Sequence, residues 1–236
     1  MERAMGKRVK FPSDGDTCDG YLALPKSKEG PGVVVIQEWW GLVGHITDVA
    51  DRFAEAGFVA LAPDLYHGAI AKEPDQEMKL LMGLAMDKAA LDIAGAAAYL
   101  KSLPEVTGKG IGAIGFCMGG SLALWSATLS PEIISTIAFY PGMPWPRMAP
   151  VWANYADKRA AIHCAESDGT SAAPGIQEAL TGIRAGGGTV EAFDYPGTKH
   201  AFFNNDRPEV FSENDSALAW KRVISQFEES LALYLN

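Results

Sequence analysis

A cysteine occupies the centre of the segment Gly-Phe-Cys-Met-Gly, residues 115 to 119, between the apolar run 110–114 and the helix-like run 121–125. Small residues two positions before and after Cys117 let a strand turn sharply into a helix, and such a turn lifts the side chain out of the sheet. The thiolate form of cysteine is a nucleophile. The segment therefore predicts a strand-to-helix elbow with Cys117 as its nucleophile.

A thiol at this elbow needs a base, because free cysteine has a pKa of about 8.5. The chain has 4 histidines. His200 follows the predicted strand 189–195 after a short turn, at the strand end where sites form in open parallel sheets. His163 fits a satisfied histidine inside a strand, whereas His45 and His67 fit surface or loop positions. His200 is therefore the predicted base.

The same edge of the predicted sheet supplies an acid. Asp168 follows the predicted strand 160–167 at its carboxyl end, one strand before His200. Asp194 is a competitor, but it lies within a strand rather than past its end. We therefore favour Asp168, which would hold the base in one tautomer and stabilise the imidazolium. The order Cys117, Asp168, His200 is the chain order expected of α/β-hydrolases.

Two backbone N–H groups are expected to form an oxyanion hole. Met118 starts the helix after the elbow, where the helix dipole favours an anion, and Trp39 lies in the loop after the predicted strand 32–37. Glu38 directly follows that strand, and periodicity alone leaves two readings open, an acid that faces water or a group in the cleft. Three aromatic residues are expected in the wall of an apolar cleft: Trp40, Phe202 and Phe203.

Apolar strands alternate with helical patterns from about residue 32 onward, which is typical of a mostly parallel sheet with helices on both faces. Continuous apolar runs such as 32–37 indicate strands that are buried on both faces. The segments 8–11 and 20–24 alternate like a hairpin and predict antiparallel edge strands at the N-terminus. With no linker or internal repeat, we expect one α/β domain over residues 1–236.

Two further segments carry structural expectations. A long helical stretch over about 73–102 is expected to break near 84–87. The segment 143–150 holds three prolines in seven residues, which forbids a regular element and predicts a loop near the site.

Composition limits the classes of partner. The net charge is -9 and the sequence pI is about 4.9, and this negative charge disfavours nucleic acid and anionic membranes as partners. We expect a cytoplasmic protein, because the chain lacks the apolar segments of a signal peptide or a membrane span. The 3 cysteines suit neither a disulfide framework nor the paired spacing of zinc sites. Cys18 and Cys164 fit buried small apolar residues.

The chain resembles the dienelactone hydrolase family over almost its whole length. Five motifs in order carry the resemblance: Gln37-Glu-Trp-Trp-Gly41, Pro63-Asp-Leu-Tyr66, Gly115-Phe-Cys-Met-Gly-Gly120, Ser167-Asp168 and Gly197-Thr-Lys-His-Ala-Phe202. The resemblance implies an α/β-hydrolase fold and a Cys117, His200 and Asp168 triad. It also implies that Glu38 pairs with the thiol and takes part in its activation when substrate binds.

The implied reaction is attack of a thiolate on an ester or lactone carbonyl, followed by hydrolysis of an acyl-thioenzyme, with no cofactor and no metal. Members that act on dienelactone hold its carboxylate with arginines. Here Asn204 stands at one such position and residues 66 to 102 contain no arginine, although Arg207 or Lys79 could substitute in part. Thioesterase or broad carboxylesterase activity is the alternative, and a catalytically silent binding protein is a third. The oligomeric state stays open, with a monomer favoured.

Overall fold

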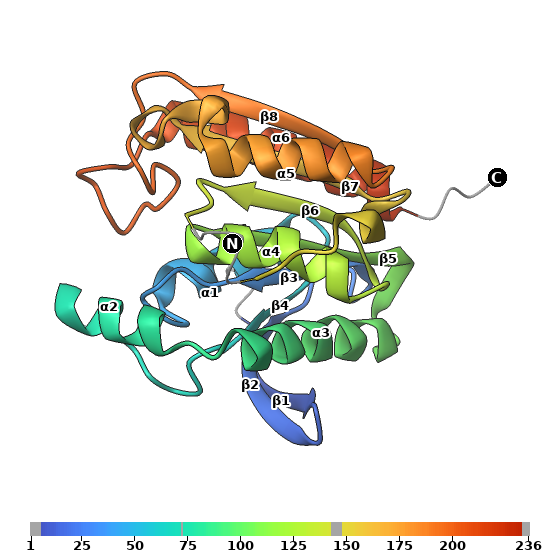
Figure 1. The fold of residues 1–236 in the computed structure, drawn as a ribbon. Helices are drawn as coiled ribbons and strands as arrows, with labels where there is room; N and C mark the ends of the chain where they lie inside the picture. The colour runs from blue at the N-terminus through green and yellow to red at the C-terminus, as the bar shows by residue number, and fades with distance from the viewer. Residues whose placement is uncertain (1–5, 72, 143–147, 233–236) are drawn as a thin grey trace.

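One mixed sheet forms the centre of the protein (Figure 1). The computed structural model describes residues 6–71, 73–142 and 148–232. In the described chain the sheet has 8 strands in the order β1-β2-β4-β3-β5-β6-β7-β8. The strands are β1 (Lys7–Ser13), β2 (Asp16–Ala23), β3 (Gly30–Ile36), β4 (Val59–Pro63), β5 (Val106–Phe116), β6 (Ile133–Phe139), β7 (Arg159–Ala165) and β8 (Thr189–Tyr195).

The N-terminal strands differ in direction from the others. β1 pairs antiparallel with β2, and β2 pairs antiparallel with β4, whereas the pairs from β4 through β8 are parallel. This arrangement confirms the predicted mostly parallel sheet with antiparallel N-terminal edge strands. All carboxyl ends of the parallel strands consequently open onto one edge, where sites form in such sheets.

Helices cover both faces of this sheet (Figure 1). The helices are α1 (Gly44–Glu55), α2 (Pro74–Gly83), α3 (Met86–Ser102), α4 (Met118–Leu129), α5 (Pro174–Ala185) and α6 (Glu213–Leu231). α1 and α6 contribute to one core cluster, and α3, α4 and α5 contribute to the other. No helix in the described part of the chain is both long and apolar enough to span a bilayer.

Strand β3 shows why a continuous apolar run belongs at the centre. Val33 and Val35 pack into the cluster with α1 and α6, whereas Val34 and Ile36 pack into the opposite cluster. All four side chains are 0% exposed. Burial of each contributes roughly 1.5–3 kcal/mol. Helices cover both faces of the sheet. Polar side chains at alternate positions of β3 would therefore be buried without hydrogen-bond partners.

The break in the long helical stretch lies where it was expected. α2 ends at Gly83, Leu84 and Ala85 are extended, and α3 begins at Met86. The predicted loop 143–150 falls largely on residues 143–147, which lie outside the described residues. Met148, at its far side, is 3% exposed and packs in the core.

Candidate active site

Cys117 lies at a sharp turn between β5 and α4. Its backbone has φ 53 and ψ -118, a conformation that residues with a side chain rarely adopt. The flanking glycines permit this turn, since a Cβ on Gly115 would collide with the Gly119 carbonyl and a Cβ on Gly119 with the Gln37 carbonyl. The Cys117 N–H donates to the Phe139 carbonyl at 3.0 Å. The structure thus has the predicted elbow, with a thiol that is only partly buried.

Cys117 differs from the other two cysteines in its surroundings. Cys18 and Cys164 are 0% and 3% exposed. Burial, reinforced by nearby carboxylates, raises the pKa of each of these two thiols to about 12. Both are therefore protonated at neutral pH and poor nucleophiles, which leaves Cys117 as the thiol available for chemistry.

His200 and Asp168 meet beyond the carboxyl ends of β8 and β7. His200 Nδ1 lies 2.7 Å from Asp168 Oδ2, and each side chain is about one-third exposed, 35% and 34%. Asp168 ends a short 3-10 turn, Glu166–Asp168, that follows β7. The His200 N–H donates to Ser167 Oγ at 2.8 Å, which ties the two loops together. The loops therefore hold the imidazole against the carboxylate.

Asp194, the competing acid, contacts Ser171. Its carboxylate accepts hydrogen bonds from the Ser171 N–H at 2.6 Å and the Ser171 hydroxyl at 2.8 Å. Asp194 thus fastens the turn that precedes α5, and the geometry agrees with the preference for Asp168 as the partner of His200.

The pKa of His200 reflects both of its neighbours. Burial alone lowers it, but hydrogen bonds with Asp168 and with Cys117, together with the charges of these two groups, raise the pKa to about 10. His200 therefore favours the imidazolium form, which would stabilise a thiolate at Cys117.

The raised pKa predicts a pH-dependent contribution to stability. The folded state holds the His200 proton more tightly than the unfolded state does, so the stabilisation is complete below pH 6.5 and is lost as the pH rises toward about 10. The Tm advantage of wild type over His200→Gln should shrink across this window when both are followed by thermal denaturation. An advantage that grew with pH would contradict the assignment.

Glu38 is buried at the end of β3 rather than facing water. Its side chain is 2% exposed. Glu38 Oε1 accepts from the Tyr140 hydroxyl at 3.4 Å, and Oε2 accepts from Asn204 Nδ2 at 3.1 Å. The first of the two readings left open by the sequence, a water-facing acid, is therefore wrong. A buried carboxylate beside the elbow is a costly arrangement, and its hydrogen bonds offset that cost.

Tyr140 connects Glu38 to the rest of the site. Its ring centroid lies 5.0 Å from that of His200. Burial, the Glu38 charge and the Cys117 charge raise the pKa of Tyr140 well above its usual value, so the phenol remains a donor. Tyr140 and Asn204 were missed as site residues. An aromatic residue directly after β6 and an amide in the loop after His200 are weak sequence signals, because only the fold brings both to Glu38.

The two expected oxyanion residues come from the start of α4 and from the loop after β3. Met118 begins α4, so its N–H is at the helix N-terminus. Its side chain is buried, and the Tyr66 hydroxyl contacts its Sδ at 3.8 Å. Trp39 is half-buried in the loop after β3, where the Gly41 N–H donates to the Glu38 carbonyl at 3.4 Å. Their oxyanion role stays a prediction.

The expectation that Phe202 and Phe203 line the cleft is wrong, because they are 0% and 1% exposed. Phe202 packs against Tyr195 at 4.8 Å and Phe203 against Phe139 at 4.7 Å between ring centroids. Both belong to the core cluster beneath α1 and α6. Burial of two large rings stabilises the fold more than exposure in a cleft would.

The other two expected substrate-binding residues do share a pocket. Trp40 and Arg207 line a pocket of about 350 Å³ together with Asn204, which also contacts Glu38. Arg207 Nε donates to Glu209 Oε1 at 2.9 Å. The guanidinium therefore already has a carboxylate partner.

Of two further histidines, His163 lies where the sequence predicts it and His45 does not. His163 is buried in β7, its Nδ1 lies 2.7 Å from the Tyr195 hydroxyl, and burial lowers its pKa to about 3, so it is the expected neutral sheet histidine. His45 is 1% exposed, and its ring centroid lies 5.6 Å from that of Phe116. The prediction of a surface or loop position for His45 is therefore wrong, because α1 turns it into the core.

Comparison with known proteins agrees with this fold. The model of the dienelactone hydrolase family matches residues 18–231. Protein usf of Aquifex pyrophilus is 34% identical, with 96% of this chain and 100% of that protein covered. A protein of Aquifex aeolicus named "Putative carboxymethylenebutenolidase" is 31% identical, also with 96% of this chain and 100% of that protein covered.

Solved structures share the architecture. A dienelactone hydrolase-like promiscuous phosphotriesterase from metagenomic libraries has a TM-score of 0.80 at 21% identity, with 96% of this chain and 98% of that chain covered. An acylaminoacyl peptidase of Pyrococcus horikoshii has a TM-score of 0.75 at 14% identity, with 100% of this chain and 43% of that chain covered. The chain therefore belongs to the dienelactone hydrolase family and is a hydrolase with the α/β-hydrolase fold.

Proposed function

We propose that the protein cleaves a lactone or a small carboxylic ester through an acyl-thioenzyme, with Cys117, His200 and Asp168 as a catalytic triad. One observation carries the proposal: the His200–Asp168 pair, with 2.7 Å between Nδ1 and Oδ2, lies beyond the carboxyl ends of β8 and β7, at the same edge of the sheet as the Cys117 elbow after β5. This is the nucleophile, base and orienting acid that acyl transfer needs.

The first half of the reaction forms the acyl-thioenzyme. The Cys117 thiolate attacks the carbonyl carbon, and the carbonyl electron pair moves onto oxygen to give a tetrahedral intermediate. The N–H groups of Met118 and Trp39 stabilise this oxyanion. When the intermediate collapses, the C–O bond to the leaving oxygen breaks and the His200 imidazolium donates its proton to that oxygen.

The second half releases the acid. Neutral His200 accepts a proton from water while the water oxygen attacks the thioester carbonyl. Collapse of the second tetrahedral intermediate breaks the C–S bond and returns the thiolate beside the imidazolium. Asp168 stabilises that imidazolium in both halves. Each step balances with water as the only co-substrate, so no cofactor or metal is required.

Glu38 takes part in activating the thiol. In the structure its carboxylate is held by Tyr140 at 3.4 Å and Asn204 at 3.1 Å. A substrate that enters beside Asn204 would compete for the amide and free the Glu38 carboxylate. Where Cys117 is still a thiol, Glu38 would accept its proton and pass it to neutral His200, which gives the same thiolate and imidazolium that the cycle regenerates. Glu38 thus links substrate binding to formation of the nucleophile.

The charges near the site favour an uncharged substrate. Asn204 supplies a neutral amide, and Arg207 is paired with Glu209 at 2.9 Å. Asp206 and Glu209 line the same pocket, so acidic side chains outnumber the arginine there. A substrate carboxylate would meet repulsion without a free bidentate partner. A broad carboxylesterase or thioesterase is therefore the second candidate function on this scaffold.

A matched pair of esters tests this substrate class. p-Nitrophenyl butyrate and mono-p-nitrophenyl succinate have the same leaving group and similar length, but only the second carries a carboxylate. We expect kcat/KM for the butyrate to be at least about tenfold higher, as one unfavourable charged contact predicts. A dienelactone and an acyl thioester extend the panel and rank the two candidate functions.

Arg207→Gln provides the control for this comparison. Since Glu209 already occupies the guanidinium, the variant should leave both kcat/KM values within about twofold. Preference for the succinate, lost in Arg207→Gln, would contradict the proposal and assign a carboxylate-binding role to Arg207. Absence of turnover for every panel member would contradict the proposed activity itself.

A further inference from the structure

Three side chains with metal-binding donor atoms converge outside the active site. Cys18 comes from β2, Asp92 from α3 and His67 from the loop after β4. The thiol sulfur, an imidazole nitrogen and a carboxylate oxygen all lie within 4.8 Å of one another. We propose that Cys18, His67 and Asp92 form a binding site for a zinc-type divalent cation.

Two of the donors are fixed in the core. Cys18 and Asp92 are each 0% exposed. Asp92 Oδ1 accepts from the Ser13 hydroxyl at 2.5 Å and from Lys88 Nζ at 3.0 Å. His67 Nε2 lies 2.9 Å from the other oxygen, Oδ2. The carboxylate is therefore oriented through Oδ1, while Oδ2 faces the imidazole and can bind a cation.

The loop that carries His67 is held in place by its own hydrogen bonds. Its backbone has φ 49 at His67, in the left-handed region. The Asp64 carboxylate accepts from the Gly68 N–H at 2.9 Å and the Tyr66 N–H at 3.3 Å. This turn directs the imidazole toward Asp92. The arrangement exists without a cation, so little ordering is needed when one binds.

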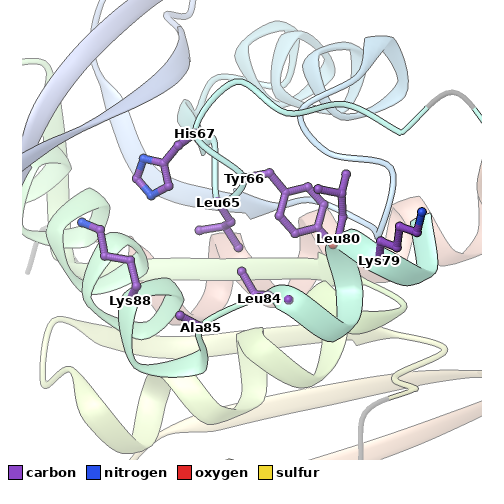
Figure 2. Close-up of a pocket in the computed structure, with 9 residues that line it drawn as sticks. Leu65, Tyr66, His67, Lys79, Leu80, Leu84, Ala85 and Lys88 are labelled. Atoms are coloured by element: carbon purple, nitrogen blue, oxygen red, sulfur yellow. The ribbon is translucent and has the colours of Figure 1, made fainter. Parts of the chain in front are cut away.

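His67 is the donor of this cluster that faces solvent. The His67 side chain is 41% exposed, and it lines a pocket of about 280 Å³. Figure 2 shows His67 and the amino end of Lys88 at one end of this pocket and Lys79 at the other. The half-exposed ring can also move by the short distance that a tetrahedral site requires.

The donor set selects the class of cation. A thiolate, an imidazole and a carboxylate are ligands that zinc prefers, at about 2.0–2.3 Å, with water as a fourth ligand. Binding replaces the thiol proton of Cys18, so one proton is released. Two anionic ligands match the charge of the cation. Lys88, bound to Asp92 Oδ1, opposes binding by charge repulsion but occupies neither the sulfur nor Oδ2.

Cobalt(II) tests the site because it takes zinc geometry and gives a visible thiolate-to-metal absorption. All proteins carry Cys117→Ala, so that the active-site thiol cannot contribute, and are first freed of metal by chelation. We expect one equivalent of Co²⁺ to produce the thiolate band and Zn²⁺ to displace it, with a Zn²⁺ Kd of about 1 µM or tighter.

Variants assign the ligands. Cys18→Ser should abolish the thiolate band, whereas Cys164→Ser, at another buried cysteine, should retain it. His67→Ala alters a half-exposed loop side chain, so it keeps the fold, and it should weaken Zn²⁺ binding by at least about 10–100-fold. Lys88→Met should strengthen binding several-fold, by about 2–10-fold, because it removes the opposing charge.

Three results would overturn the proposal. The first is a thiolate band that persists in Cys18→Ser, the second is unchanged affinity in His67→Ala, and the third is no Zn²⁺ binding in the parent protein. In the third case the cluster is a hydrogen-bonded element of the fold only. The test reads metal binding directly, so its outcome is independent of the proposed ester hydrolysis.

Discussion

Replacing Cys117 with alanine is expected to lower kcat/KM for every ester and lactone by at least about four orders of magnitude, with the fold unchanged. In the proposed mechanism the thiol forms the covalent bond, and the proposed oxyanion hole alone would supply only the residual rate. The side chain is partly buried and caps no helix with a hydrogen bond, so its loss leaves little cavity. Steady-state kinetics on p-nitrophenyl butyrate, with circular dichroism as the check of folding, measure this effect.

Cys164→Ala is the matched control for this variant. Cys164 is 3% exposed in β7 and contacts the Ile162 carbonyl at 3.9 Å. The same atoms are removed, but from the core, so we expect a modest loss of stability and kcat/KM within about twofold of wild type. Turnover that survives in Cys117→Ala, or that is lost in Cys164→Ala, would assign the nucleophile elsewhere.

The fold could be predicted because its signals are local. The unbroken apolar run of β3 can be satisfied only by a strand with both faces buried, as Val33 and Val34 show by packing into opposite clusters. The break between α2 and α3 at Leu84 and Ala85 is likewise visible in a short window. Such patterns depend on neighbours within a few residues.

The placement of the three proposed triad residues could be predicted for a different reason. Asp168 and His200 each follow a strand, β7 and β8, and these strands are adjacent and parallel. Their carboxyl ends must therefore meet at the same edge as the elbow after β5. Topology alone brings Cys117, Asp168 and His200 together, and side-chain packing then sets the 2.7 Å contact.

Contacts that depend on packing could not be predicted. Tyr140 and Asn204 reach Glu38 across 102 and 166 residues of sequence. Phe202 and Phe203 follow His200 directly, yet the backbone turns both rings into the core. The position of a residue in the sequence predicts at which edge of the sheet its loop lies. It does not predict the direction in which each side chain of that loop points.

The Cys18, His67 and Asp92 cluster illustrates the same limit. Metal-site spacing rules depend on ligands within a few residues of one another. Here the donors come from three elements between residues 18 and 92. Only the pairing of β2 with β4 and the packing of α3 against β1 place them together.

Asp168→Asn is expected to lower kcat by about 10²–10⁴-fold, with a smaller change in KM. The amide has nearly the shape of the carboxylate, so the 2.7 Å contact with His200 Nδ1 can persist. It lacks the negative charge that stabilises the imidazolium, and its NH₂ group can hold the imidazole in the wrong tautomer. Both effects act on proton transfer rather than on substrate binding, so kcat falls while KM changes less.

Asp194→Asn makes the same chemical change one strand away. Asp194 bonds to the N–H and hydroxyl of Ser171 and has an exposed side chain, so its loss should cost about 1 kcal/mol of stability or less. Its kcat should stay within about threefold of wild type, since the observed contact of His200 is with Asp168. Measuring kcat and Tm for both variants separates the two carboxylates. A mild effect at Asp168 with a severe loss of kcat at Asp194 would assign the orienting acid to Asp194, because only the carboxylate that holds the imidazolium controls the rate of proton transfer.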